Sequence, residues 1–396
     1  MKTIENVNFF NKRVFVRVDF NVPLDQNQKI LDDTRILRAL STIKKISFDG
    51  GKVIIASHMG RPKNGYNNKF SLVHIVKKLS SLLGQPVAFS ADCFGDVPEG
   101  MIKKMNRGDV LVLENLRFHK QETSGCSEFA KKLSHLADAY VNDAFGVSHR
   151  KHASTFTIAS FFKNKSYFGL LMKKEIESLN LVFKKPIRPV TAIVGGAKIS
   201  SKIFVLKSLI GKVDNIIVGG GMAYTFFKAQ GFSVGRSLVE NNMLGVANEI
   251  LNLVKKSKTQ FFLPIDSLNS TDLCEFENTE TTTADKIGVN KMGVDIGSGS
   301  VGIFSETIIN SKTVVWNGPM GVFEKPAFER GTKSIALAVV EATKRGAFTL
   351  VGGGDSVAAI KKFNLMDGVS YVSTGGGAML EFLEGKKLPG ILAVGG

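Results

Sequence analysis

The feature that most constrains this chain is that its apolar runs stop abruptly at glycines. In TVVWNGPMGVFE (313–324), a buried strand pattern breaks into a polar loop with two glycines. The same happens in PVTAIVGGAK (189–198), NIIVGGG (215–221), FTLVGGGDS (348–356) and VSYVSTGGG (369–377). Glycine allows backbone N–H groups to approach a ligand closely, and such N–H groups bind anions. The sequence therefore predicts one phosphate-bearing ligand in the second half of the chain.

Strand patterns alternate with helical patterns along the chain. Residues 71–83 (SLVHIVKKLSSLL), for instance, have the period of an amphipathic helix. Alternating β and α elements predict parallel sheets that are covered on both faces, with ligands beyond the carboxyl ends of the strands. The strand patterns lie at residues 14–18, 53–56, 110–113 and 139–141 in the first half, and at 190–194, 216–218, 261–264, 313–316, 348–351 and 371–373 in the second.

A domain boundary is predicted near residues 169–188. Residues 170–181 (LLMKKEIESLNL) have the pattern of one amphipathic helix, and Pro186 and Pro189 prevent it from continuing. We therefore expect an α/β chain with two doubly wound, Rossmann-like lobes of parallel strands. The lobes are predicted at residues 1–168 and 189–384, joined by a hinge helix and linker at 169–188.

The net charge of +17 allows several interpretations. Residues 1–168 hold 26 basic and 15 acidic side chains (+11), and residues 169–396 hold 26 and 20 (+6). One interpretation is a solvated basic surface without a specific function. An equally good one is that the first half of the chain attracts small anions. Nucleic acid is the third alternative, but the chain has no RNP-like, KH or zinc-finger pattern and no basic tail. We expect no nucleic-acid partner.

The cysteines and the hydropathy pattern favour a cytoplasmic protein. Cys93, Cys126 and Cys274 are isolated, without the CxxC spacing of zinc sites or a disulfide framework. No stretch reaches the roughly 18 uninterrupted apolar residues of a membrane span, and the first residues lack the apolar segment of a signal peptide. We therefore expect no zinc and no membrane association.

Polar side chains gather after the strands of the first half. Guanidinium groups match the geometry of phosphate and carboxylate, so four arginines and a histidine at one sheet edge would form an oxyanion receptor. A single arginine is more often part of a surface ion pair. Only the presence of several arginines, most of them shortly after a strand, favours an anion-binding site. Asp33 or Thr34 could cap the helix that carries Arg35. The residues concerned are Asp19, Asn21, Arg35, His58, Arg61, Arg117 and Arg150.

The remaining histidines do not suggest a metal site. His74 lies within an amphipathic helix pattern, and we interpret it, like His119 and His135, as a surface or packed side chain. His149 and His152 are three residues apart, but an arginine and a lysine separate them. We expect no metal ion bound by histidine.

In the second half, a glycine pair and two lysines follow the strand at 190–194. Gly195-Gly196-Ala197-Lys198 precedes Ile199-Ser200-Ser201-Lys202, which we expect to open a helix. Lys198 and Lys202 should then share one face near a helix N-terminus, which favours an anion. Two solvated lysines are the alternative.

The same half of the chain contains one partial nucleotide-binding pattern and one candidate metal ligand. A Walker A loop is absent, and GSGSVG (297–302) matches GxGxxG without the βαβ context of a dinucleotide fold. We predict a turn before a helix there, although a nicotinamide dehydrogenase remains an alternative that NADH fluorescence would test. Asp355, after Gly352–Gly354, is the best carboxylate for Mg²⁺, which is usually held by one or two carboxylates and substrate phosphates.

Several segments together resemble the phosphoglycerate kinase family. The resemblance implies a two-lobed glycolytic kinase that transfers a phosphoryl group between 1,3-bisphosphoglycerate and ADP, giving 3-phosphoglycerate and Mg·ATP. It also implies a monomer whose C-terminal segment, at about 385–396, packs on the first lobe. The segments are VRVDFNVP, HMGRP, ENLRF, NDAFGVSHRKHAST, GGAKISSK, GGGMAYTF, WNGPMGVFE, GGGDS and STGGGA, in the family's order and spacing from about residue 4 to about residue 390.

The resemblance also implies a role for each matching residue. The seven polar residues of the first half would bind the triose phosphate, Glu324 would contact the ribose, Asp355 would hold Mg²⁺, and Gly375–Gly377 would line the phosphate path. The nucleotide would be bound by Gly196, Ala197, Lys198, Lys202, Gly293, Asn317, Pro319, Glu324, Gly353, Gly354, Asp355 and Ser356. Catalysis would involve Arg35, Lys198, Gly354 and Gly376.

The expected chemistry fits this set of residues. In the direction of ATP consumption the nucleophile is a carboxylate, already ionised at pH 7, so no general base is needed. The protein must position two anions in line and offset the charge of the moving group, for which we expect Arg35 and Lys198. Hinge closure would bring the lobes together on the roughly μs–ms timescale and exclude water.

Three segments depart from the family pattern. Ser201 stands where many members have aspartate, DIGSGS (295–300) replaces a DIGPK-like turn, and LPIDSL (263–268) replaces LPVDVV. None of these departures affects the residues that we consider essential. An inactive relic that serves as a scaffold is a separate alternative. The intact arginine set and Lys198 argue against it.

Overall fold

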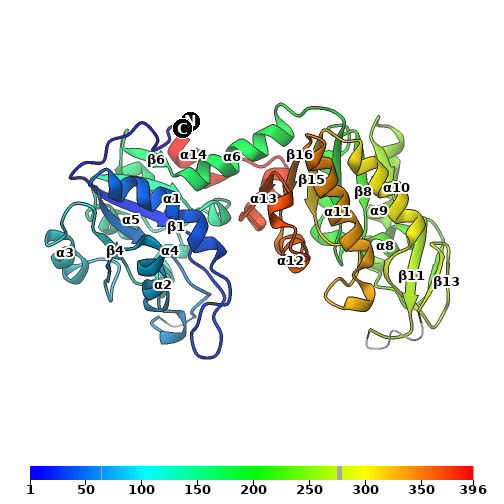
Figure 1. Cartoon of the computed structure of the whole chain (residues 1–396), viewed down its shortest axis with the longest axis horizontal. Coiled ribbons are helices and arrows are strands. Elements are labelled where there is room, and N and C mark those ends of the chain that lie inside the picture. The colour runs from blue at the N-terminus through cyan, green and yellow to red at the C-terminus, as the bar shows by residue number, and fades with distance from the viewer. Residues whose placement is uncertain (64, 274–278, 396) are drawn as a thin grey trace. The chain divides into compact units, whose positions relative to one another are not determined.

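The computed structural model describes residues 1–63, 65–273 and 279–395, so Cys274 lies outside the described residues. The chain divides into two compact units, Met1–Ile176 together with Lys387–Gly396, and Glu177–Lys386. The division falls within helix α6 (Leu170–Phe183). Each unit contains one six-stranded parallel sheet with helices between the strands, which confirms the predicted α/β class (Figure 1).

In the first unit, the strands are ordered β3-β4-β2-β1-β5-β6. The chain moves outward from β1 in one direction, then returns to the other side of β1 to form β5. This reversal next to β1 is the topological position at which α/β sheets bind ligands. The elements are β1 (Arg13–Val18), α1 (Thr34–Phe48), β2 (Lys52–Ala56), α2 (Val73–Leu83), β3 (Val87–Phe89), α3 (Asp96–Lys103), β4 (Val110–Val112), α4 (Lys120–Thr123), α5 (Ser127–Ser134), β5 (Ala139–Asp143) and β6 (Ser166–Phe168).

Alternation along β1 fills two separate layers of the first unit. Val14, Val16 and Val18 point into the core that β1 shares with α1 and α2. The residues between them point to the opposite face, where the Phe15 ring packs against Tyr140 of β5 at 6.3 Å. Arg17 lies on that second face and is fully buried. A charged side chain in such a position requires polar partners, which the site provides.

The C-terminal segment belongs to the first unit. Helix α14 (Pro389–Gly395) packs beside β6, close to the N-terminal residues (Figure 1). The N–H of Gly390 donates to the carbonyl of Ser148 (2.8 Å), and Asn142 Nδ2 donates to the carbonyl of Gly390 (3.2 Å). A Cβ at Gly390 would lie 3.0 Å from the Ser148 backbone, so glycine allows this close packing.

In the second unit, the parallel strands are ordered β10-β8-β7-β15-β16-β17. The first strand of this sheet, β7, pairs with both β8 and β15, so the reversal lies between β7 and β15. The elements are β7 (Val190–Val194), α7 (Ile203–Leu209), β8 (Asn215–Val218), α8 (Met222–Ala229), α9 (Leu244–Lys255), β10 (Gln260–Phe262), α10 (Ser298–Ile309), β15 (Thr313–Asn317), α11 (Arg330–Lys344), β16 (Phe348–Val351), α12 (Gly354–Lys362), β17 (Tyr371–Val372) and α13 (Gly377–Leu383).

Two small sheets of the second unit were not predicted. One contains three antiparallel strands, ordered β12-β11-β14, and the other pairs β13 with β9 in parallel. Strands β3 and β6 at the edges of the first sheet were also missed. The small sheets comprise β9 (Ser233–Val234), β11 (Asp266–Ser270), β12 (Glu280–Thr283), β13 (Lys286–Ile287) and β14 (Met292–Ile296).

The structure contradicts two local predictions about helix N-termini. The prediction that the glycine pattern at 297–302 forms a turn before a helix is wrong, because only Gly297 precedes α10 and residues 298–302 form the first turns of that helix. The N–H groups of Gly299 and Ser300 donate to the Asp266 carboxylate (both 2.8 Å), which binds the N-terminal end of the helix. The prediction that Asp33 or Thr34 caps α1 is wrong. Asp33 precedes the helix but makes no capping hydrogen bond, because its carboxylate pairs with Lys78 at 2.8 Å.

The helices are short relative to a lipid bilayer. Across the residues that the structure describes, none combines the length and the apolar character that crossing a membrane requires.

Candidate active site

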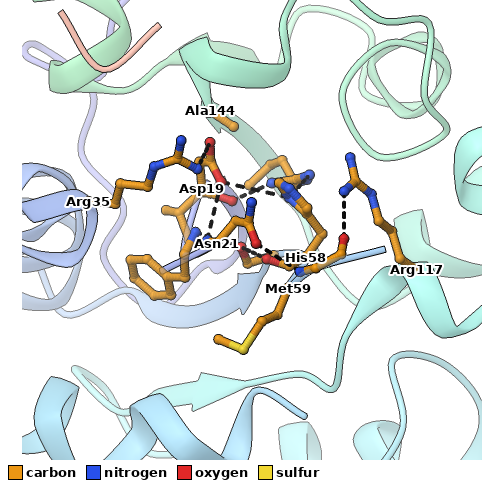
Figure 2. Close-up of polar contacts among 12 residues, drawn as sticks. Asp19, Asn21, Arg35, His58, Met59, Arg117 and Ala144 are labelled. Carbon is orange, nitrogen blue, oxygen red and sulfur yellow. Dashed lines mark hydrogen bonds and ion pairs between the residues drawn. The ribbon is translucent and has the colours of Figure 1, made fainter. Parts of the chain in front are cut away.

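The carboxyl edge of the first sheet brings together side chains from four separate segments (Figure 2). Asp19 and Asn21 follow β1, His58 follows β2, Arg117 follows β4, and Arg35 projects from the first turn of α1. Arg35 Nη1 lies 2.9 Å from Asp19 Oδ2. The Asp19 side chain is 10% exposed and that of Arg35 is 37% exposed, so the pair lies at the boundary between the core and solvent.

A second set of contacts fixes the loop after β2. Asn21 Oδ1 accepts a hydrogen bond from the N–H of Gly60 (2.8 Å), and Arg117 Nη1 donates to the carbonyl of Gly60 (2.8 Å) (Figure 2). Gly60 has φ of +60°, and a Cβ there would lie 2.3 Å from the Phe70 ring. Glycine is therefore required at this position, and the loop holds Asn21 and Arg117 in place.

The positively charged side chains of this site lower the pKa values of their neighbours. Burial, followed by the charges of Arg17, Arg117 and Arg35, holds the pKa of His58 well below its usual range. Burial and the neighbouring Arg17 lower the pKa of Arg117 to about 10. His58 is therefore neutral at pH 7, whereas Arg117 remains charged.

The tautomer of His58 follows from its neighbour. Arg17 Nη2 lies 3.3 Å from His58 Nδ1. A guanidinium group can only donate, so Nδ1 accepts and the ring proton is on Nε2. The Asp19 carboxylate, 3.8 Å from the same Nδ1, consequently forms no ion pair with the neutral ring. His58 can offer its Nε2–H to a ligand.

Arg17 is the residue of this site that sequence reasoning missed. Its Nε donates to Ser154 Oγ (2.8 Å), and it also donates to the carbonyl of Val18. Ser154 in turn donates its hydroxyl and its N–H to the carboxylate of Glu122 (2.7 and 3.0 Å). All three side chains are fully buried. The available signal was a charged residue inside the apolar strand FVRVDF.

The other predicted residues of the first unit are placed less centrally. Arg150 is exposed, but it lies close enough for its charge to lower the pKa of Arg117 and of His152. Burial is the largest cause for His152, whose pKa falls to about 3. Arg61 is exposed, and within the described part of the chain its side chain has no hydrogen-bond or ion-pair partner. Arg35, His58 and Arg117 are thus held at one sheet edge by contacts with neighbouring residues of the site, whereas Arg150 acts on this site through its charge alone.

At the carboxyl edge of the second sheet, the loops after β7 and β15 interlock through glycines. The N–H of Gly195 donates to the carbonyl of Asn317 (2.9 Å), and that of Gly196 donates to the carbonyl of Pro319 (3.0 Å). A Cβ at Gly195 would lie 2.2 Å from the Pro319 carbonyl oxygen, and one at Gly318 would lie 2.1 Å from that of Gly195. Only glycines allow the two loops to approach this closely.

The prediction that Lys198 and Lys202 share one helix face is wrong. Lys198 precedes the short 3-10 helix η5 (Ile199–Ser201), and Lys202 lies between η5 and α7 with φ of −123°. The helix is interrupted because the Ser200 side chain donates to Glu240 Oε1 (2.6 Å), and the Ser201 side chain donates to the carbonyl of Lys198 (2.8 Å). The two lysines therefore have different surroundings.

Lys198 is exposed, whereas Lys202 is partly buried and donates to Asn317 Oδ1. Burial lowers the pKa of Lys202, and the charge of Asp355 opposes this shift. Asn317 Nδ2 donates to the carbonyl of Gly352 (2.7 Å), so Asn317 connects Lys202 to the loop after β16. This network places an ammonium group close to Asp355.

A cavity of about 380 Å³ lies beside this network in the second unit. Its walls also include Gly220, Tyr224, Leu238 and Met320, which give it apolar surface suited to a flat ring. A Cβ at Gly293 would lie 2.0 Å from the Tyr224 hydroxyl, so a side chain there has no room. Six predicted nucleotide-binding residues line the cavity: Gly196, Ala197, Gly293, Pro319, Glu324 and Asp355.

Two helices of the second unit begin directly after glycines with positive φ. Gly353 (φ +95°) precedes α12, and Gly376 (φ +45°) precedes α13. A Cβ at Gly353 would lie 2.4 Å from Asn317 Nδ2. Gly354 is the first residue of α12 and is exposed. The Ser356 hydroxyl is buried and accepts from the N–H of Gly318, so it supports the loop after β15.

Asp355 is suited to hold a divalent cation. It lies exposed in the first turn of α12 and lines the cavity. In the chain as described, its carboxylate accepts no hydrogen bond, so both oxygens are available. A single carboxylate next to a phosphate site is the usual protein contribution to Mg²⁺ binding.

The comparisons with known proteins agree over almost the whole chain. The family model described as phosphoglycerate kinase matches residues 4–386. The phosphoglycerate kinase of Chloroherpeton thalassium is 50% identical over 393 residues, which cover 99% of this chain and 98% of the relative. The phosphoglycerate kinase of Dictyoglomus turgidum is 50% identical over 380 residues, covering 96% and 94%.

Two solved structures have the same fold. The structure of phosphoglycerate kinase from Coxiella burnetii matches with a TM-score of 0.90 and 40% identity, covering 99% of this chain and 98% of the other. That from Pyrococcus horikoshii matches with a TM-score of 0.86 and 32% identity, covering 100% and 98%.

Proposed function

Because the chain belongs to the phosphoglycerate kinase family, a family of glycolytic kinases, we propose that its two compact units bind the two substrates separately. The enzyme transfers a phosphoryl group between 1,3-bisphosphoglycerate and ADP, giving 3-phosphoglycerate and ATP. The first unit binds the triose phosphate, and the second binds the nucleotide. The observation that supports this division is that the carboxyl edge of each parallel sheet has its own set of polar residues or glycines, one rich in arginine and one rich in glycine.

In the first unit, Arg35, His58 and Arg117 surround the carboxylate and phosphate of 3-phosphoglycerate. Arg35 is already positioned by Asp19 (2.9 Å), and Arg117 by the carbonyl of Gly60 (2.8 Å). Each guanidinium retains free N–H groups for the ligand. Asp19 and Asn21 complete the set, while Arg61 and Arg150 reach the ligand from exposed positions.

In the second unit, the apolar cavity accommodates the adenine base, and Glu324 at its wall binds the ribose. Gly196, Ala197, Gly353 and Gly354 offer backbone N–H groups to the phosphates, and Lys198 and Lys202 supply positive charge. The remaining residues of the set, Gly293, Asn317, Pro319 and Ser356, shape the loops around them. Asp355 holds the Mg²⁺, which when bound offsets part of the phosphate charge.

The transfer itself requires positioning rather than acid–base chemistry. The attacking carboxylate is ionised at pH 7, and His58 is neutral and held by Arg17, so neither needs to lose a proton. Arg35 from one unit and Lys198 from the other offset the charge that spreads over the moving phosphoryl group. Gly354 and Gly376, at the starts of α12 and α13, direct N–H groups toward it.

Since the two substrates bind to different units, the units must approach each other for transfer. We assign the hinge to residues 169–188, which contain α6 and the segment before β7. Closure excludes water, which would otherwise hydrolyse the acyl phosphate.

We also propose that the protein is a monomer of the cytoplasm. The buried thiol of Cys93 and the free thiol of Cys126 suit a reducing compartment.

The experiment that tests the division is a pair of ligand titrations followed by NMR of the labelled chain. 3-Phosphoglycerate should shift resonances after β1, β2 and β4, and Mg·ADP should shift those around Gly196, Gly293 and Asp355. A coupled assay with 3-phosphoglycerate and Mg·ATP should report turnover. If both ligands perturbed the same unit, the proposed division would be wrong even if the enzyme were active.

A further inference from the structure

Three side chains with metal-binding atoms, none of which we assign to a substrate, converge in the first unit. Asp92 and Cys93 follow β3, and His119 directly follows the 3-10 helix η2 (Leu116–Phe118). One ligand atom from each residue lies within 4.8 Å of the other two. Ligands on one zinc ion in tetrahedral geometry lie roughly 3.5 Å apart, so shifts of about 1 Å would complete such a site.

The three side chains are held in place by their surroundings. Asp92 Oδ1 accepts the N–H of Cys93 (2.7 Å) and lies 3.3 Å from His119 Nε2. The His119 ring packs against Phe94 and Phe129, with ring centroids 5.0 and 5.4 Å apart. Orientation of ligands by neighbouring groups increases metal affinity.

The charges around these three side chains and their exposure to solvent also favour the binding of a cation. Burial, followed by the negative charges of Asp92 and Glu122, raises the pKa of the Cys93 thiol. The same two carboxylates would attract a cation to this position. Cys93 is fully buried, whereas the side chains of Asp92 and His119 are 45% and 27% exposed. An ion can therefore enter from the solvent side, and a water molecule can complete its coordination.

We propose that Asp92, Cys93 and His119 form a binding site for a divalent transition metal of the zinc class. Thiolate and imidazole ligands favour zinc or cobalt over Mg²⁺ and Ca²⁺, which prefer oxygen. Three protein ligands and an open position describe an exchangeable rather than a closed structural site. This site is separate from the carboxylate of Asp355, and it revises the expectation, based on cysteine spacing alone, that no zinc binds.

The site adjoins the substrate-binding residues through η2. Arg117 lies two residues before His119, and its N–H donates to Asn115 Oδ1 (3.0 Å) within the same turn. A metal that ties His119 to Asp92 and Cys93 would fix the end of this turn. Metal occupancy is therefore expected to change the affinity for 3-phosphoglycerate, whereas the affinity for Mg·ADP should stay the same.

The test uses Co²⁺ as a spectroscopic probe on the full-length chain. The background is the Cys126→Ser/Cys274→Ser variant, in which Cys93 is the single cysteine. Titration with Co²⁺ should produce a thiolate-to-cobalt charge-transfer band, and Zn²⁺ should abolish it by displacement. His119→Gln and Asp92→Asn should weaken binding by at least about tenfold. His135→Gln, which changes an exposed histidine elsewhere in the same unit, should leave binding unchanged.

Two results would overturn the proposal. One is the absence of a thiolate band in the background variant, which would leave Asp92 and His119 as an ordinary ion pair. The other is unchanged Co²⁺ affinity in His119→Gln. Because Cys93→Ser alters a buried group, its fold is checked by circular dichroism before its loss of the band is counted. His119→Gln changes a partly exposed residue and tests the site independently.

Discussion

The backbone N–H of Met172 donates a hydrogen bond of 2.9 Å to Asp143 Oδ1, which ties the first turn of α6 to the end of β5. The chain passes so close to the carboxylate that a Cβ at Gly169 would lie 2.2 Å from the same oxygen. The second oxygen, Oδ2, is buried without a hydrogen-bond partner in the described structure. Burial raises the pKa of Asp143 to about 7, and the hydrogen bonds to it only partly offset this shift.

We expect Asp143 to make the first unit less stable as the pH rises. Its carboxyl group binds a proton more tightly in the folded state (pKa about 7) than in the unfolded state (3.8). The stabilisation is complete below about pH 4 and is lost between pH 4 and 7, at up to about 1.4 kcal/mol per pH unit. Asp143→Asn keeps an acceptor for Met172 but cannot titrate, so urea unfolding followed by circular dichroism should show a weaker dependence on pH.

The same titration contains its own control. Trp316 is the sole tryptophan and lies in the second unit, so its fluorescence reports that unit. Asp295, also in the second unit, has a pKa raised to about 7 by burial. The fluorescence-detected dependence on pH should therefore persist in Asp143→Asn. A variant whose circular dichroism curves keep the full dependence of the parent would contradict the role of Asp143.

Arg35→Ala should lower kcat by about 10²–10³, the typical effect of losing one group that stabilises transition-state charge. The fold should persist, because the side chain of Arg35 is 37% exposed. The matched control is Arg345→Ala, which removes an exposed arginine paired with Glu341 on α11. Turnover in the coupled assay distinguishes them, and equal rates for the two variants would remove Arg35 from the mechanism.

Lys198→Ala should also lower kcat by orders of magnitude, while leaving stability almost unchanged because the side chain is exposed. Lys255→Ala, at the exposed end of α9, provides the control for loss of one positive charge. Single-turnover measurement with saturating Mg·ATP separates transfer from binding. Wild-type transfer in Lys198→Ala would assign the charge-offsetting role to another group.

Arg17→Lys should raise KM for 3-phosphoglycerate and lower the free energy of unfolding by about 1–3 kcal/mol. Lysine retains the charge but cannot bond to Ser154, Val18 and His58 together, so His58 loses the neighbour that fixes its tautomer. Arg13→Lys is the control on the same strand, since Arg13 pairs with Asp138 at a partly exposed position. That pair is worth about 1 kcal/mol or less. Equal unfolding energies for the two variants would exclude a structural role of the Arg17 network.

Gly293→Ala should weaken Mg·ADP binding because the new Cβ would lie 2.0 Å from the Tyr224 hydroxyl at the cavity wall. Gly245→Ala in α9 is its control, since a Cβ there meets no atom within 4 Å. The control should be neutral or more stable by up to about 1 kcal/mol. Isothermal titration calorimetry measures both variants, and unchanged nucleotide affinity in Gly293→Ala would argue that the cavity is not the nucleotide site.

The large parallel sheets could be predicted because their inner strands are apolar runs. Val190–Val194 and Phe348–Val351 match β7 and β16 in every residue. The antiparallel sheet could not be predicted in this way, since β11 and β12 read DSLNS and ETTT. Strands that cover a small part of the core have no continuous apolar pattern, and tertiary pairing decides their conformation.

The roles of single residues, too, could be predicted only where they follow from a local sequence pattern and not from tertiary contacts. Asp19, His58 and Arg117 could be grouped because each follows a strand of one parallel sheet. Arg17 could not, because a strand pattern does not tell whether a charged side chain faces solvent or a buried partner such as Ser154. The error at Lys198 and Lys202 has a similar origin, since the helix between them is interrupted by side-chain hydrogen bonds from Ser200 and Ser201.

The hydrogen bond between Asn142 and Gly390 joins residues that are 248 positions apart in the chain. A ribosome must therefore translate all of the second unit before it supplies the helix that completes the first. Until then, Ser148 and the end of β6 lack their final packing partner in the nascent polypeptide. The first unit is thus synthesised first but completed last. Premature termination between residues 177 and 386 would truncate the second unit and would also leave the first unit without its last helix.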